Sequence, residues 1–81
     1  MIKNITISRA ARTADDRAAF RWNWIVALGA GQTDTFTAEW DEDNALVVVE
    51  RNGELVACYE GRRTAMSLSK AVKSAIDEIY F

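Results

Sequence analysis

The sequence predicts an α+β domain: an antiparallel sheet of four to five strands with one C-terminal amphipathic helix packed on one face. Three observations predict this fold. Apolar and polar residues alternate through most of the chain, an Asn-Gly pair joins two alternating runs, and the period becomes helical after Ser67. At 81 residues the chain forms a single domain, 1–81, with a thin core.

The first segment, residues 2–9, alternates between two faces and is rich in β-branched residues. This pattern is typical of a strand, and its polar second face suits the edge of a sheet. Residues 8–19 are rich in Ala and Arg, and Thr13 with Asp16 resembles a weak helix N-cap. A short helical turn and an irregular connection both remain open for this segment.

Two aromatic runs, residues 20–28 and 34–40, alternate in the same way and are joined by a short glycine-containing loop. They predict an antiparallel hairpin. Their tryptophans, Trp22, Trp24 and Trp40, fall on the apolar stripes of the two strands. We expect them to pack in the core under the helix, because the arginine between the aromatics points to the opposite face from a base-stacking surface.

Asn52-Gly53 is the strongest turn signal, because these residues tolerate the two positive φ angles of a type I′ turn. We therefore expect residues 45–51 and 54–60 to pair directly. A regular two-residue turn pairs Arg51 with Glu54, Val49 with Val56 and Val47 with Cys58 on one face. On the other face it pairs Glu50 with Leu55, Val48 with Ala57 and Leu46 with Tyr59.

The last segment is predicted to be a helix that begins at an N-cap, Ser67, with Met66 packing against Ala71. Its core-facing stripe consists of Leu68, Val72, Ala75, Ile76 and Ile79.

One helix of about 14 residues is about 21 Å long and covers only one face of such a sheet. Apolar residues of the last hairpin then remain on the other face, and an apolar patch of this kind usually marks an interaction site. We expect it to bury against another protein or a second copy, giving a homodimer. The candidate residues are Leu46, Val48, Leu55 and Tyr59, although the alternate set on the other face of the hairpin remains open, because the exposed face depends on the register.

Charge is unevenly distributed along the chain: residues 29–60 carry a net charge of −7, whereas the flanking segments are positive. The cluster Glu39, Asp41, Glu42 and Asp43 is a candidate acidic patch for a basic partner. A solvated turn is the alternative interpretation. A calcium loop is disfavoured, because Ala45 stands where that loop needs glycine. A smaller candidate basic patch consists of Arg62 and Arg63.

The chain has no His and one Cys. Imidazole catalysis and the usual zinc sites are therefore excluded, and we expect no catalytic residue, no metal, no cofactor and no enzymatic activity. The longest apolar run, residues 45–49, is too short to cross a membrane. The single thiol of Cys58, which we expect to be buried, and the lack of a secretory signal predict a cytoplasmic location.

In length, acidic charge and strand-plus-helix architecture the chain resembles the small phage-encoded inhibitors of bacterial defence, such as anti-CRISPR proteins. The resemblance covers the whole chain but rests on no family motif. It implies inhibition of a host nucleoprotein complex, either sterically or through an acidic surface that occupies a nucleic-acid groove. The alternative is a nucleic-acid-binding accessory protein that uses an aromatic and basic sheet surface.

Overall fold

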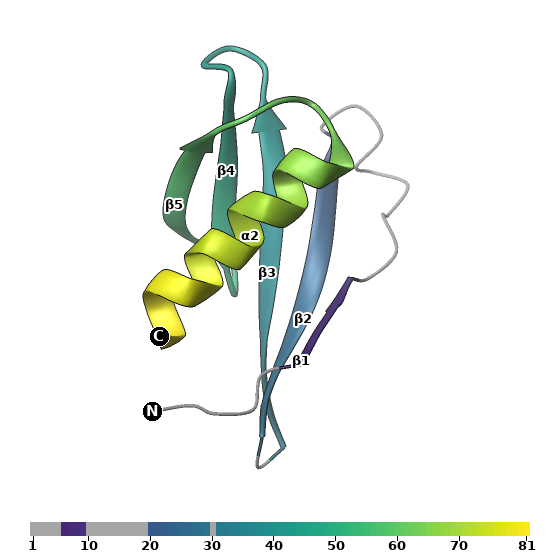
Figure 1. Ribbon diagram of the computed structural model, residues 1–81, viewed down its shortest axis with the longest axis vertical. Helices are drawn as coiled ribbons and strands as arrows, with labels where there is room; N and C mark the ends of the chain where they lie inside the picture. Colours follow the sequence, from purple (N-terminus) through teal and green to yellow (C-terminus); the bar gives the residue numbers. More distant parts are fainter. Residues whose placement is uncertain (1–5, 10–19, 30) are drawn as a thin grey trace.

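The computed structural model describes residues 6–9, 20–29 and 31–81. Within them the chain forms five strands and one helix. Their bounds are β1 Thr6–Arg9, β2 Arg21–Gly29, β3 Gln32–Asp41, β4 Leu46–Arg51, β5 Glu54–Glu60 and α2 Ala65–Tyr80. The strands form one antiparallel sheet in chain order, β1-β2-β3-β4-β5, and α2 lies diagonally across one face (Figure 1). The predicted fold class is confirmed. The alternatives for residues 10–19 lie outside the described residues.

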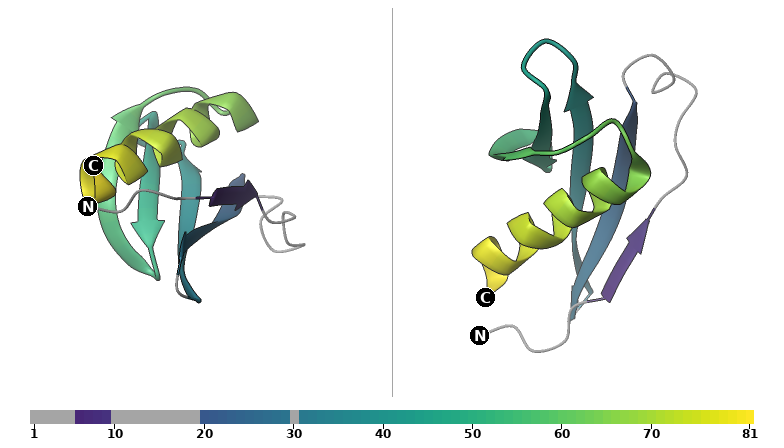
Figure 2. Two further views of the ribbon diagram at one scale, coloured as in Figure 1. Left: turned by 60° about the horizontal axis from the view of Figure 1, so that its bottom comes forward. Right: turned by 45° about the horizontal axis from the view of Figure 1, so that its top comes forward.

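The core lies between the two layers, α2 and the sheet face beneath it (Figure 2). The tryptophans take the predicted side: Trp24 is 4% exposed, and Trp22 and Trp40 pack partly buried against the core. The helix stripe is confirmed except at its end, where Ile79 is 36% exposed. The buried residues of the sheet are Trp24, Val26, Phe36, Ala38, Val47 and Val49, and those of the helix are Leu68, Ala71, Val72, Ala75 and Ile76.

Helix α2 begins one turn earlier than the sequence predicts. Thr64 is the N-cap: its backbone is extended, and its Oγ1 accepts a hydrogen bond of 3.1 Å from the Ser67 amide. The Ser67 hydroxyl instead accepts from the Arg62 amide at 3.0 Å and ties the preceding loop to the helix. The prediction of Ser67 as the N-cap is therefore wrong, and so is the packing of Met66, which is 70% exposed.

The β4–β5 turn forms as predicted, with φ of +51° at Asn52 and +88° at Gly53. Glycine suits the second position because a Cβ is strained at that φ. The first pairs of the ladder are also confirmed, Arg51 with Glu54 and Glu50 with Leu55.

Beyond these pairs the register shifts by one residue, because a β-bulge leaves Val56 as an extra residue in β5. Val49 therefore pairs with Ala57 rather than Val56, and the remaining predicted pairs are wrong by the same single step. Each later side chain of β5 therefore lies on the face opposite to the one that a regular ladder predicts for it. Tyr59, predicted to share a face with Leu46 and Val48, lies opposite Val47 and packs against the core under α2.

Candidate interaction surface

The sheet face opposite α2, here called the open face, is covered by no helix or strand among the described residues (Figure 2). Its side chains are those that alternate with the buried ones, so it mixes carboxylates, threonines and aliphatic residues. On strands β3, β4 and β5 the members are Thr33, Thr35, Thr37, Glu39, Asp41, Leu46, Val48, Glu50, Leu55, Cys58 and Glu60.

The open face contains a hollow of about 330 Å³ between β3 and β4. Glu39 lies directly opposite Val48 in the ladder, and Glu50 is two residues further along β4. Side chains in such a diagonal relation are about 7–8 Å apart at the backbone, so two carboxylates flank an apolar floor. The hollow is lined by Glu39, Trp40, Asp41, Glu42, Val48 and Glu50.

Three of the four predicted acidic residues therefore meet around this hollow, whereas Asp43 lies outside its lining. Asp41 also builds the β3–β4 turn, because its carboxylate accepts hydrogen bonds from the Asp43 amide at 3.1 Å and from the Asn44 side chain at 2.8 Å. These hydrogen bonds lower the pKa of Asp41, and the bond from the Asn44 side chain has the largest effect. Glu50 was missed by the sequence analysis, although its alternation with Val48 on the same face was visible in the sequence.

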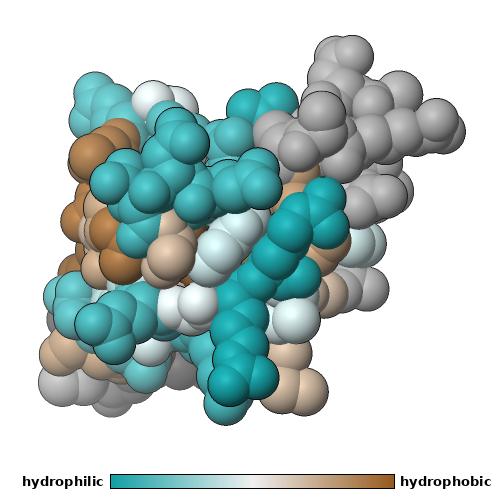
Figure 3. Space-filling view, turned by 90° about the horizontal axis from the view of Figure 1, so that it is seen from above, coloured by the Kyte–Doolittle hydropathy of each residue, from teal (hydrophilic) through white to brown (hydrophobic). Residues whose placement is uncertain are grey.

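The exposed apolar residues concentrate toward β5. Leu55 is 63% exposed and Val56 is 40% exposed, whereas Leu46 and Val48 are half-buried. Seen from above, hydrophobic atoms gather on the flank where β5 lies in Figure 1 (Figure 3). Cys58, expected to be buried, is exposed here because the bulge turns it to the open face. The predicted apolar face thus keeps Leu46, Val48 and Leu55 and loses Tyr59.

Tyr59 takes a different role on the helix side. Its hydroxyl donates to Glu78 Oε2 of α2 at 3.2 Å, and burial together with this carboxylate raises the Tyr59 pKa. The tyrosine therefore joins β5 to the last turns of the helix.

The two arginines of the predicted basic patch lie in different surroundings. The Arg63 guanidinium lies over the Phe20 ring, 4.5 Å from its centroid, which is a cation–π contact. Arg62 lines a separate hollow beside Glu60 and Lys70. The structure therefore does not bring the two side chains together as one cationic site.

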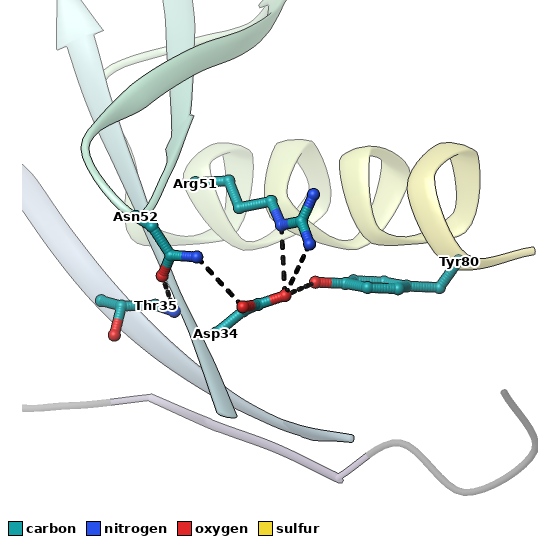
Figure 4. Close-up of polar contacts among 5 residues, drawn as sticks. All are labelled: Asp34, Thr35, Arg51, Asn52 and Tyr80. Atoms are coloured by element: carbon teal, nitrogen blue, oxygen red, sulfur yellow. Dashed lines mark hydrogen bonds and ion pairs between the residues drawn. The ribbon is translucent and has the colours of Figure 1, made fainter. Parts of the chain in front are cut away.

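A second group of polar side chains, centred on Asp34, joins β3, the β4–β5 turn and the end of α2 (Figure 4). Asp34 is only 9% exposed. Its Oδ1 accepts from Asn52 Nδ2 at 3.0 Å, and its Oδ2 accepts from Arg51 Nε at 3.1 Å and from the Tyr80 hydroxyl. Asn52 in turn accepts from the Thr35 amide at 2.9 Å. We call these four residues, Asp34, Arg51, Asn52 and Tyr80, the Asp34 cluster.

Electrostatics keep this cluster charged. The hydrogen bonds from Tyr80 and Asn52, with the Arg51 cation, hold the Asp34 pKa below its ordinary value, and the carboxylate raises the pKa of Arg51. Burial, assisted by the bond to Asp34, raises the Tyr80 pKa to about 12. The Tyr80 ring also meets Phe36 edge-on, at 6.2 Å between centroids. The cluster therefore fixes the strands that carry the open face and has no group that titrates near neutral pH.

Among residues 6–9, 20–29 and 31–81, no group of three His, Cys, Asp or Glu side chains lies together as ligands for a metal ion. Helix α2, the helix in that part of the chain, is too short and too polar to cross a lipid bilayer. Comparison with family models, curated proteins and solved structures finds no match for this chain.

Proposed function

We propose that this protein is a non-enzymatic binding module that attaches through its open face to a basic surface of another protein. The hollow between β3 and β4 carries the proposal, because it combines carboxylates with an apolar floor on a face that no described element covers. Such a site suits a partner side chain that is both long and cationic.

A lysine or arginine of the partner fits this hollow in a definite way. Its methylene stem lies on Val48, and its charged end lies between Glu39 and Glu50. Arginine makes the better fit, because its planar guanidinium can donate to both carboxylates at once. The exposed carboxylates of the adjoining turn, Glu42 and Asp43, extend the negative surface and speed encounter with a basic partner.

More specifically, we propose that the protein is encoded by a phage or mobile element and inhibits a nucleoprotein complex of the host cell. A groove that binds nucleic-acid phosphates is lined with Lys and Arg, which is the surface that the open face complements. Occupation of that groove excludes the nucleic acid directly. Competition between the protein and the nucleic acid for the complex is then the expected behaviour.

Two other occupants match the open face less well. A homodimer through this face brings the Glu39 and Glu50 carboxylates of two copies together, and like charges oppose such a contact. Single-stranded nucleic acid needs exposed aromatic rings to stack its bases, but Trp24 is buried and the carboxylates of the hollow repel phosphate.

The test is a charge reversal with a matched control. A partner captured by the wild-type protein from a host lysate is purified, and its affinity is measured against Glu39→Lys with Glu50→Lys. The control, Met66→Lys with Ser74→Lys and Asp77→Lys, changes the net charge equally at exposed positions of α2. We expect the open-face pair to weaken binding by at least about tenfold and the control by less than about threefold. Equal loss in both variants contradicts the proposal.

A further inference from the structure

The outer edge of β5 is a second place where a partner can attach, distinct from the hollow. β5 ends the sheet, so one side of its backbone faces no strand among the described residues. It is seven residues long, which exceeds the four of the opposite edge strand, β1. Two of its own apolar side chains, Leu55 and Val56, are exposed. An accessible edge of this kind accepts an added strand through main-chain hydrogen bonds.

The charged residues of β5 indicate which kind of strand can pair with its outer edge. Glu54 and Glu60, one at each end of the strand, are exposed. Antiparallel pairing of two copies of β5 along their full length brings the Glu54 of each copy to the same end as the other copy's Glu60, on opposite faces of the joined strands, and like charges gathered in this way oppose the pairing. The same two carboxylates attract a strand that has Lys or Arg at both ends. The edge therefore rejects a second copy and favours a cationic segment.

The bulge at Val56 sets the spacing of those cations. Along the pairing with β4, the seven residues of β5 match only six, Leu46–Arg51. An added regular strand has to match the same length on the other side, so its cations are five positions apart rather than six. Residues five apart point to opposite faces of a strand. Glu54 and Glu60 are likewise on opposite faces, since Glu54 pairs with Arg51 and Glu60 with Leu46.

We propose that the outer edge of β5 binds an extended segment of a partner protein by strand addition, with a Lys or Arg at the first and sixth positions and β-branched residues between them. This contact does not require the hollow, so the proposal stands or falls separately from the proposed function.

The probe is the capped hexapeptide Lys-Val-Thr-Val-Thr-Lys, titrated into the whole protein while amide shifts and amide hydrogen exchange are followed by NMR. Strand addition protects alternate β5 amides, because only every second amide points outward. We expect such alternate protection, and affinity about tenfold higher than for the same peptide with Glu at both ends. A heptapeptide with cations six positions apart is expected to bind about threefold more weakly than the hexapeptide.

Two variants complete the design, both at exposed positions where the fold tolerates change. Glu54→Lys with Glu60→Lys is expected to weaken hexapeptide binding about tenfold, whereas a variant of equal charge change on α2, Met66→Lys with Ser74→Lys and Asp77→Lys, is expected to leave it within about threefold. The proposal is overturned if the β5 amides gain no alternate protection at about 1 mM peptide, or if the peptide with Glu at both ends binds with equal affinity. It is also overturned if the free chain sediments as a dimer and its outward β5 amides are already protected from exchange.

Discussion

Replacement of Asp34 by alanine removes the carboxylate that accepts from Asn52, Arg51 and Tyr80. Two of these donors come from residues 17 and 46 positions away in the chain, so the substitution separates elements that only the fold brings together. The variant leaves the donors without their acceptor and introduces no new buried polar group. Its loss of stability therefore measures what the Asp34 cluster contributes.

The expected size of this loss follows from burial. A hydrogen bond to a charged group contributes about 1.5–3 kcal/mol. The Arg51 side chain is 38% exposed, so water screens its ion pair, which we count at about 0.5 kcal/mol. The part-buried bonds from Tyr80 and Asn52 bring the total to about 3 kcal/mol. A chain of this length has about 4–12 kcal/mol of stability, so the variant still folds but melts about 12–24 °C lower.

The assay is urea denaturation followed by tryptophan fluorescence, with Thr33→Ala, an exposed neighbour on the same strand, as the control. The Asp34 pKa lies below its ordinary 3.8, so its stabilisation is complete well above pH 3.8 and is lost as the pH falls through the lowered value. The stability gap between the wild type and Asp34→Asn should therefore narrow in acid. A loss for Asp34→Ala below about 1 kcal/mol, or a gap for Asp34→Asn that does not change with pH, refutes the reasoning.

Three further outcomes are expected. In alkaline titration followed by absorbance at 295 nm, Tyr80 should ionise near pH 12, because burial raises its pKa. The free energy of unfolding should therefore fall as the pH rises from 10 toward 12. Ionisation of Tyr80 at the ordinary tyrosine pKa of 10.0 contradicts this prediction. Deletion of Val56 should leave stability within about 1 kcal/mol, because it removes the bulge and leaves the pairs on either side intact; a chain that no longer unfolds cooperatively in urea contradicts it. Gly61→Ala should cost about 1–2 kcal/mol in the same assay, because its Cβ would come within 2.9 Å of the buried Val47 side chain; an unchanged midpoint counts against that contact.

The sequence was sufficient for the elements that have a strong period. Alternation in residues 20–28 and 34–40 correctly assigned the tryptophans to the helix-covered face, because burial on one side of a sheet imposes period two. The Asn-Gly turn was equally clear, since few residue pairs tolerate two positive φ angles.

The register of β5 was not predictable in the same way. Both faces of the last hairpin are apolar, so hydrophobic pattern alone does not choose between a regular ladder and a bulged one. In the structure, Tyr59 packs under α2 and donates to Glu78, a contact that depends on where the helix ends. That information lies nineteen residues further along the chain.

The Asp34 cluster was missed for a related reason. A carboxylate in an aromatic stripe was a visible anomaly, because Asp34 precedes Phe36 in the same alternation. Its meaning depends on partners that β4 and α2 supply only after folding. The acidic hollow was partly foreseen, since three of its carboxylates are close in sequence, whereas Glu50 joins them through strand pairing.

Photo-crosslinking with benzoylphenylalanine on each side of the molecule tests most directly whether the open face is the binding surface. The probe is placed at Thr35, which is exposed on the open face, or at Lys73, which is exposed on α2. With the partner captured by the wild-type protein, we predict an adduct from the Thr35 position and none from the Lys73 position. An adduct from Lys73 alone contradicts the account.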